Sequence, residues 1–223
     1  MQAGRVRLHT TSCVAVRIMV LYIAYNMSCQ SWDCCVGALM GRSSWVSHDA
    51  MGHIRAALMP DNRRVVRLCL ATGLRISDAL AIKTARLKSR MTVRDSKTGK
   101  AHRISIPAPL LRELQEHAGR IYVFEGRLDP QRSRTRQAVY KDIRRVAAMY
   151  KRSGVIPRAA VVSPHTARKI AAVDAYHAGG VDAARKVLNH SQDDAAVTLL
   201  YALADQMDAG GVTHGTGKRR RVR

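Results

Sequence analysis

The sequence predicts a mainly α-helical protein with one small antiparallel β-sheet, an α+β fold. Two patterns support this class. Apolar residues recur every three or four positions through several segments, and they alternate with polar residues in two short neighbouring segments. A chain of 223 residues is long enough for one substantial domain and short for two. We therefore expect one main core, formed by residues 45–209.

The first predicted helices surround a glycine. Helical patterning starts near Ser47, with a short amphipathic piece at 53–58 and a longer apolar-rich helix at 63–72. Gly73 follows directly, and glycine at this position can end a helix and turn the backbone. A new helix is expected at 76–81. Arg75 therefore falls at the junction between two helices.

A β-hairpin is predicted next. Residues 91–95 and 102–107 show strand alternation, and the intervening Ser-Lys-Thr-Gly-Lys supplies turn residues, among them Gly99. This places Lys97 near the tip. Lys100 and Arg103 lie close by, so the tip is strongly basic, and both are candidate contacts to nucleic-acid phosphates. A helix at 109–118 and a short apolar run at 121–124 are expected after it.

The last third of the chain is predicted to be helical. A good helix spans 135–152, and its other face carries four basic residues that are candidate DNA contacts: Arg136, Lys141, Arg144 and Arg145. Further helices are expected at 166–178 and 182–188, separated by Gly179-Gly180, and at 195–206. The last of these carries Tyr201.

Charge is the most lopsided property of the composition. The chain has 38 Lys and Arg against 16 Asp and Glu, a net charge of +22 and a sequence pI near 10.9. A polyanionic partner is the simplest interpretation, although a basic RNA-binding protein would have a similar composition. Aromatic residues are scarce, so base stacking on aromatic side chains is disfavoured and phosphate contacts on duplex DNA fit better.

The two ends of the chain are less informative. Residues 1–44 have no clear period apart from an apolar run at 14–25, which is too short to span a bilayer and contains Arg17. We leave this segment unassigned; a buried helix or a mis-assigned upstream start explains the apolar run better than an export signal does. Residues 210–223 form a basic tail that we expect to be disordered. The five cysteines predict neither a disulfide framework nor a zinc site, so no metal or other cofactor is expected, and a reduced cytoplasmic compartment is the simplest assumption.

Four further boxes of polar residues carry the chemistry. They contain, in chain order, Arg75, Lys97, His165-x-x-Arg168, His190 and Tyr201. Arginines bind phosphate bidentately, a lysine can protonate a leaving oxygen, and a tyrosine hydroxyl can act as a nucleophile. The set therefore indicates cleavage of a nucleic-acid backbone without a metal.

These boxes resemble those of the tyrosine recombinases, the phage integrase family. The matching segments are ATGLRISDAL at 71–80, DSKTGKAHRISIP at 95–107, PHTARK at 164–169 and LNHSQDDAAVTLLY at 188–201. Four such segments in the right order are more specific than any one of them. The resemblance covers roughly residues 44–208 and implies the integrase catalytic-domain fold.

The resemblance also implies a mechanism. Arg75, Arg168, His165 and His190 would hold the scissile phosphate while Tyr201 attacks it, giving a 3′-phosphotyrosyl link. Lys97 would protonate the 5′ oxygen, and Asp78 would support Arg75. No metal or ATP is required. Strand exchange would need a tetramer on synapsed double-stranded DNA at the nucleoid, and an accessory DNA-bending protein is a further implied partner.

Each residue also has a local alternative. Arg75 could form a salt bridge with Asp78, three residues on; Lys100 competes with Lys97; and Tyr201 could be ordinary helix packing. The family usually has Gly before the second histidine and often His after the clamp arginine, where this chain has Asn189 and Lys169. Asn tolerates left-handed backbone, so the turn before His190 can survive.

Three rival functions remain open at this point. A type IB topoisomerase-like enzyme would nick and religate one duplex. A recombinase-derived DNA-binding protein would bind without cleaving. A basic RNA-binding protein unrelated to the family is the third. Members of the family usually carry a separate helical domain before the catalytic one, and residues 1–44 are too few for it. The chain is therefore expected to be a truncated reading frame, a minimal recombinase or an enzyme that relies on a partner, and to bind DNA weakly at raised salt.

Overall fold

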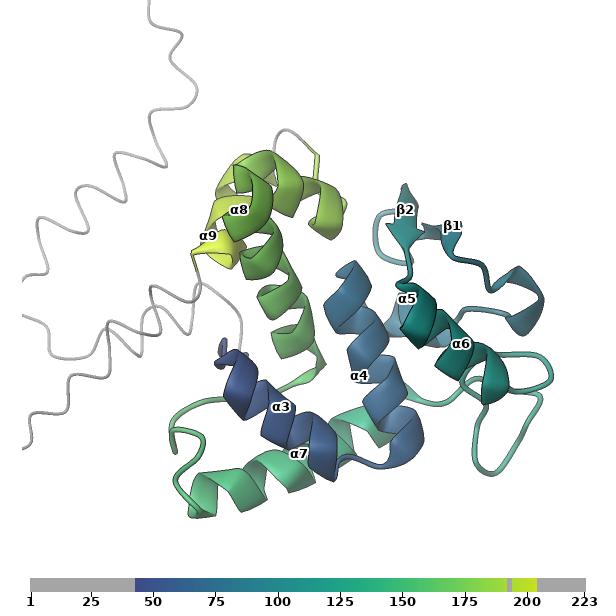
Figure 1. Ribbon diagram of the computed structural model, residues 1–223, viewed down its shortest axis with the longest axis horizontal. Helices are drawn as coiled ribbons and strands as arrows, with labels where there is room; N and C mark the ends of the chain where they lie inside the picture. The colour runs from purple at the N-terminus through teal and green to yellow at the C-terminus, as the bar shows by residue number, and fades with distance from the viewer. Residues whose placement is uncertain (1–42, 192–193, 204–223) are drawn as a thin grey trace, which may run out of the picture. The chain divides into compact units, whose positions relative to one another are not determined.

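The computed structural model describes residues 43–191 and 194–203, which fold into helices beside one two-stranded sheet (Figure 1). The elements are α3 (His48–Ala57), α4 (Pro60–Thr72), α5 (Ile76–Leu80), the short 3₁₀ helix η1 (Thr84–Arg86), β1 (Arg90–Arg94), β2 (Ala101–Ser105), α6 (Ala108–Glu116), α7 (Arg136–Arg152), α8 (Pro164–Leu188) and α9 (Ala195–Ala202). The predicted α+β class is confirmed. Most boundaries differ from those expected by one to three residues, and α3 begins five residues earlier than the short piece at 53–58.

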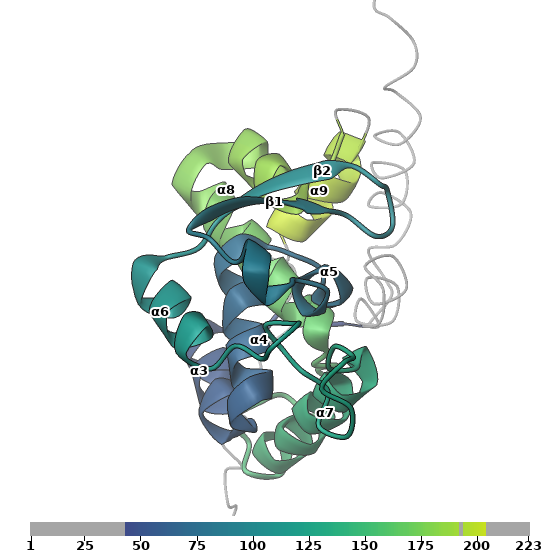
Figure 2. The same ribbon diagram turned by 90° about the vertical axis from the view of Figure 1, so that its right-hand side faces the viewer.

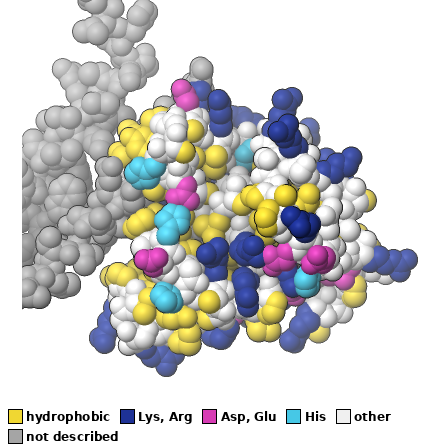
Figure 3. Space-filling model, in the orientation of Figure 1, with side chains coloured by type: hydrophobic (Ala, Val, Ile, Leu, Met, Phe, Trp, Pro, Cys, Tyr) yellow, Lys and Arg dark blue, Asp and Glu magenta, His cyan; other side chains and the backbone are white. Residues whose placement is uncertain are grey.

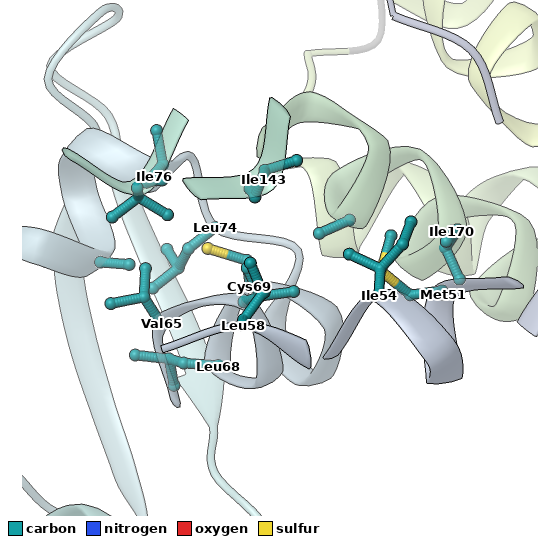
Figure 4. Packing of buried hydrophobic residues seen from close by; sticks show 14 of the residues in the cluster. Met51, Ile54, Leu58, Val65, Leu68, Cys69, Leu74, Ile76, Ile143 and Ile170 are labelled. Carbon is teal, nitrogen blue, oxygen red and sulfur yellow. The ribbon is translucent and has the colours of Figure 1, made fainter. Parts of the chain in front are cut away.

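Helix α4 lies in the core. Its Val65 and Leu68 are fully buried, as the apolar spacing of this segment requires. Helix α3 packs through Met51 and Ile54, which Figure 4 shows beside Ile170 of α8. Complete burial of each such side chain stabilises the fold by about 1.5–3 kcal/mol. Residues far apart in the sequence therefore share one core.

Helix α4 ends at a close approach between two segments. Gly73 has φ +67°, in the left-handed region, and its amide donates to the Cys69 carbonyl. A Cβ at this position would lie 2.4 Å from Cγ1 and 2.7 Å from the carbonyl oxygen of Val187. The glycine is therefore needed for its backbone conformation and for the approach of α8.

The sheet is a simple antiparallel hairpin. Arg90 pairs with Ser105 and Arg94 with Ala101, and the inward positions of β2 are His102 and Ile104. Figures 1 and 2 both place this hairpin beside the C-terminal part of α8, and His102 hydrogen-bonds to the backbone of Lys186 there. The sheet is thus attached to the helix that leads to His190.

Helix α7 is fixed to the start of α4 by a buried carboxylate. Asp142 accepts hydrogen bonds from the Met59 amide at 3.0 Å and the Asn62 side chain at 2.7 Å, and it pairs with Arg145 at 2.7 Å. Burial alone would raise the pKa of Asp142, but the hydrogen bonds from Asn62 and Arg145 outweigh it and the pKa is lowered. The carboxylate is therefore a charged anchor within the fold.

Helix α8 is broken at Gly179 and Gly180, as predicted from the sequence. Gly180 has φ +70° and ψ −165°, a conformation for which glycine is suited, and the chain turns there before a second helical stretch. The helix ends at Asn189 in the left-handed region with φ 52° and ψ 39°. The expectation that Asn would keep this turn is confirmed.

The beginning of the described chain already contacts α8. Ser44 exchanges hydrogen bonds with Val161 and accepts one from the Thr166 hydroxyl at 3.0 Å, while Ser43 accepts one from Lys169 at 2.5 Å. The apolar run at 14–25, the other cysteines besides Cys69 and the basic tail lie outside the described residues. Among the helices of residues 43–203 that are described, none is long and apolar enough to cross a membrane.

Candidate active site

Arg75 caps the start of α5 and pairs with a residue that helical spacing did not suggest. Its guanidinium donates to Asp95, at the end of the first hairpin strand. The Arg75 side chain is 17% exposed, whereas Asp95 is only 3% exposed. The alternative that Arg75 pairs with Asp78 is not realised: Arg75 pairs across the fold with Asp95, because the turn of the hairpin lies over the start of α5.

Asp78 supports the same turn by another route. Its buried carboxylate accepts the Ser96 amide at 3.0 Å, and the hydroxyls of Ser77 and Ser96 lie 3.3 Å apart. Asp95 accepts the amides of Lys97 at 2.9 Å and Thr98 at 3.2 Å. Two carboxylates therefore hold the turn that carries the predicted general acid.

The basic side chains of the hairpin are open to solvent. Lys97, Lys100 and Arg103 are all exposed. The charge of Lys100 is among the causes that lower the pKa values of His190 and Asp194. Lys100 therefore lies within electrostatic range of the second histidine, which keeps it as a competitor of Lys97.

Arg168 lies beneath the site. It is 3% exposed, and it donates to the Gly73 carbonyl at 2.5 Å and the Leu188 carbonyl at 2.6 Å. Burial, followed by the charge of Arg75, lowers the pKa of Arg168 to about 10, so it remains charged at neutral pH. Two of its five N–H groups thus bond to the segments that precede Arg75 and His190. Three N–H groups remain for a ligand.

His165 stands at the surface on the first turn of α8. The side chain of Ser163 caps this helix, accepting the His165 amide at 3.2 Å. Desolvation by the surrounding protein, then the charges of Arg168 and Arg75, lower the pKa of His165. The ring is therefore neutral at physiological pH and lies among cations.

His190 is oriented by a buried threonine. Its Nδ1 lies 3.0 Å from the Thr198 hydroxyl, whose proton goes to the Asp194 carbonyl at 3.1 Å. The hydroxyl has a single proton, so Nδ1–H must donate to it and Nε2 is left as the acceptor of the neutral ring. Burial, followed by the charge of Arg168, lowers the pKa of His190 to about 4.

Tyr201 lies beside His190 on α9. The two rings meet edge to face, with centroids 6.1 Å apart and an interplanar angle of 85°. The Nζ of Lys169 lies 6.0 Å from the centroid of the Tyr201 ring, and Tyr201 is among the groups that raise the pKa of Arg168. Tyr201 is half-buried, so it packs within the fold and at the same time lies near the basic residues His190, Lys169 and Arg168.

The α7 arginines divide into two groups. The charge of Arg136 lowers the pKa of His165, so the start of α7 lies near the site. Arg145 instead pairs with Asp142 and donates to the Ala57 carbonyl, and Arg144 lies against the Tyr140 ring. Since helices rise about 1.5 Å per residue, Arg145 is ~14 Å farther along the helix than Arg136. All four predicted contacts, Lys141 included, are exposed.

Four residues of this neighbourhood could not be recognised from the sequence as part of the site. Asp95, His102 and Thr198 are buried polar residues, and Lys169 is a lysine with only 2% of its surface exposed. A buried lysine or aspartate must be paired, and burial cannot be recognised from spacing alone. All four nevertheless lie inside the segments that resemble the recombinase boxes: Asp95 and His102 in 95–107, Lys169 in 164–169 and Thr198 in 188–201.

The arrangement is suited to binding a multiply charged anion. The fold brings three segments within electrostatic range of one another. These segments carry Arg75, Arg168, His165, His190 and Tyr201. In Figure 3, Lys and Arg side chains stand out around the edges and over the middle of the face shown, and acidic side chains are fewer. Among the described residues no group of three or more His, Cys, Asp or Glu is arranged to hold a metal ion.

Comparison with known proteins gives a consistent result. Residues 46–206 match the model of the phage integrase family. No curated protein matches the chain in sequence. Similar solved structures include a lambda integrase dimer bound to a COC′ core site (20% identity, TM-score 0.61), the XerA recombinase (19%, 0.58) and the Tn1549 transposon integrase with transposon right-end DNA (15%, 0.55).

These matches cover 72%, 74% and 74% of this chain and 48%, 61% and 65% of the respective structures. The chain therefore spans less than two thirds of the length of each. At these identities the likeness establishes the fold, including its mainly helical character and its small sheet.

Proposed function

Since the chain belongs to the phage integrase family, we propose that it is a site-specific DNA recombinase that works through a covalent 3′-phosphotyrosyl intermediate. One observation carries the proposal: Tyr201 lies against His190 in a cluster that contains both candidate arginines. A tyrosine used only for packing has no need of this setting. The catalytic unit we propose is residues 45–209.

The first step is capture of the scissile phosphate. Arg75 keeps donors beyond the one directed at Asp95, and Arg168 keeps three. The two arginines act in a partly dehydrated site, where charge-assisted hydrogen bonds are strong. His165 and His190 are neutral before binding, and the negative charge of the bound phosphate raises their pKa values, so that His190 becomes a better acceptor for the proton released in the next step.

The second step is attack. The Tyr201 oxygen forms a bond to phosphorus while the bond from phosphorus to the 5′ oxygen breaks. The phenol proton passes to Nε2 of His190, which is free to accept because Nδ1 donates to Thr198. Lys97 gives a proton to the leaving 5′ oxygen; such general acid catalysis contributes about 10²- to 10⁴-fold.

Strand exchange is the reverse reaction with another strand. The phosphotyrosyl bond retains the energy of the original phosphodiester, so a 5′-hydroxyl from a second duplex can attack it without ATP or a metal. We propose double-stranded DNA as the substrate, bound at the nucleoid by a tetramer, with the 210–223 tail adding phosphate contacts. A tetramer of lambda integrase has been seen on a Holliday junction.

The decisive experiment is covalent trapping. The protein is incubated with supercoiled plasmid and nicked duplex libraries, quenched with detergent and examined for a protein–DNA adduct. Tyr201→Phe should abolish the adduct. Tyr176→Phe is the matched control, since Tyr176 is also half-buried and lies against a histidine, His177, with centroids 5.8 Å apart.

The other outcomes identify the rival functions. An adduct with supercoil relaxation but no joining of two duplexes would indicate a type IB topoisomerase-like enzyme. DNA binding without an adduct on any substrate would indicate a recombinase-derived binding protein. An adduct that persists in Tyr201→Phe would contradict the assignment of the nucleophile.

A further inference from the structure

We propose that Asp95 is a positioning residue that joins the phosphate-binding Arg75 to the turn carrying the general acid Lys97. This inference rests on the proposed recombinase function. It assigns to Asp95 a task that neither Arg75 nor Lys97 could perform alone: it fixes the distance between the group that holds the phosphate and the group that protonates the leaving oxygen.

The two carboxylate oxygens of Asp95 have separate partners. Oδ1 accepts the amides of Lys97 at 2.9 Å and Thr98 at 3.2 Å. Oδ2 accepts from Nη1 of Arg75. One carboxylate therefore holds the backbone of the proposed acid with one oxygen and the proposed phosphate ligand with the other.

The backbone of Asp95 closes the same turn. Its amide donates to the Lys100 carbonyl at 2.9 Å, and its carbonyl accepts the Gly99 amide at 2.8 Å, with Gly99 in the left-handed region at φ +68°. The side chain of Asp95 thus hydrogen-bonds to Lys97 and Thr98, and its main chain to Gly99 and Lys100. Both candidate lysines, Lys97 and Lys100, belong to the segment that Asp95 organises.

Burial makes this contact costly to lose. Asp95 is 3% exposed, although Lys97, Thr98 and Lys100 around it are exposed. A carboxylate removed from water must be compensated by hydrogen bonds or cations, and here two amides and one guanidinium do so. The turn is therefore held at its base while the lysine side chains remain free to reach a substrate.

The contact also orients Arg75. A guanidinium has five N–H groups in a rigid plane, so fixing one of them to Oδ2 restricts the directions of the others. Catalytic groups must lie within about 0.5 Å of their productive positions. Asp78 contributes by holding the Ser96 amide, but Asp95 is the residue that contacts both functional groups.

Two substitutions separate the two contacts. Asp95→Asn retains an oxygen that can accept the Lys97 and Thr98 amides but removes the charge that pairs with Arg75. Asp95→Ala removes both. Asp142→Asn is the control, because Asp142 is an equally well-paired, buried carboxylate that anchors α7 instead of the hairpin.

The measurement is single-turnover cleavage of a site recovered from wild-type adducts, made with either a 5′-bridging oxygen or a 5′-bridging sulfur. A thiolate leaves without a proton because thiols are far more acidic than alcohols, so the sulfur substrate bypasses the general acid. For Asp95→Ala we expect cleavage of the oxygen substrate to be at least about tenfold slower than for Asp95→Asn, because the turn is also released; sulfur should recover this additional loss but not the part that comes from misplacing Arg75. For Asp95→Asn we expect a loss of similar size on both substrates, because the turn persists while Arg75 is misplaced.

The control variant should unfold at a lower temperature but keep the wild-type ratio of sulfur to oxygen rates. Equal rates for Asp95→Ala and wild type on both substrates would overturn the inference, as would an Asp95→Ala loss that sulfur does not reduce. If the wild type itself forms no adduct with either substrate, the proposed function fails first and this inference fails with it.

Discussion

His190 and Tyr201 meet edge to face across the turn between α8 and α9, with ring centroids 6.1 Å apart. They are eleven positions apart in the chain, and hydrogen bonds between Ser191 and Asp194 bring them together. The Ser191 amide and hydroxyl both donate to the Asp194 carboxylate, at 3.2 Å and 2.6 Å. The tyrosine thus meets the histidine because a polar turn closes between their helices.

Thr198→Val should impair cleavage without unfolding the protein. Valine has nearly the same shape but cannot accept the Nδ1–H of His190, so the ring loses its fixed orientation and tautomer. We expect about a tenfold loss of adduct formation, corresponding to about 1.4 kcal/mol. Thr198→Ser keeps the hydroxyl and should retain most activity. A fully active Thr198→Val variant would show that the hydrogen bond does not matter.

The roles of the two hairpin lysines can be distinguished by changing the leaving group of the substrate. Lys97→Ala should slow cleavage of an oxygen-bridged site by about 10²- to 10⁴-fold, and a 5′-bridging sulfur should restore most of it. Lys100→Ala should instead reduce DNA affinity modestly, with little difference between the substrates. If sulfur rescues Lys100→Ala and not Lys97→Ala, Lys100 is the acid, in line with its effect on the pKa of His190.

Gly73→Ala should be strongly destabilising. Its Cβ would lie 2.4 Å from the Val187 side chain and 2.7 Å from the Val187 carbonyl oxygen, at a backbone conformation with φ +67°. We expect a loss of more than about 2 kcal/mol in the free energy of unfolding, measured by urea denaturation. Gly52→Ala is the control. Gly52 lies in α3 with nothing within 4 Å of its added Cβ, so this variant should gain about 0.5–1 kcal/mol.

The protonation of His190 should depend on DNA. Its pKa in the free protein is about 4, below the unfolded value near 6.5, so the unfolded chain binds more protons between these pH values. The contribution of His190 to stability is therefore retained above pH ~6.5 and falls as the pH decreases toward 4. Titration of the imidazole by nuclear magnetic resonance should show this low pKa and its increase when a DNA phosphate binds. A pKa near 6.5 without DNA would contradict the burial and charge argument.

Asp142 should make the fold sensitive to acid. Its pKa lies below the value of the unfolded chain, so its stabilising contribution is present above pH ~4 and is lost as the pH falls through the folded value. Asp142→Asn should lower the melting temperature at pH 7 and flatten its dependence on pH below about 4. If the pH dependence of the melting temperature were the same in Asp142→Asn and the wild type, other carboxylates would determine the acid sensitivity of the fold.

Much of this protein could be predicted from local sequence. Helix periodicity gave α4, α7 and both parts of α8, and the glycines at 73 and 179–180 gave the breaks, because these signals depend on residues within one turn of each other. The order of Arg75, Lys97, His165, Arg168, His190 and Tyr201 was likewise readable, and it was sufficient to indicate the family that the comparison then established.

Only the tertiary structure decided how these residues meet. It gave Arg75 the partner Asp95 in place of Asp78, buried Arg168 against two carbonyls, and placed Lys100 within range of His190. Spacing along a chain fixes which residues share a helix face, but it contains no information on the distance between segments 20 or 95 residues apart. That distance is set by the packing of α4, α8 and the hairpin, and therefore so are the burial, the hydrogen bonds and the pKa values of the candidate site.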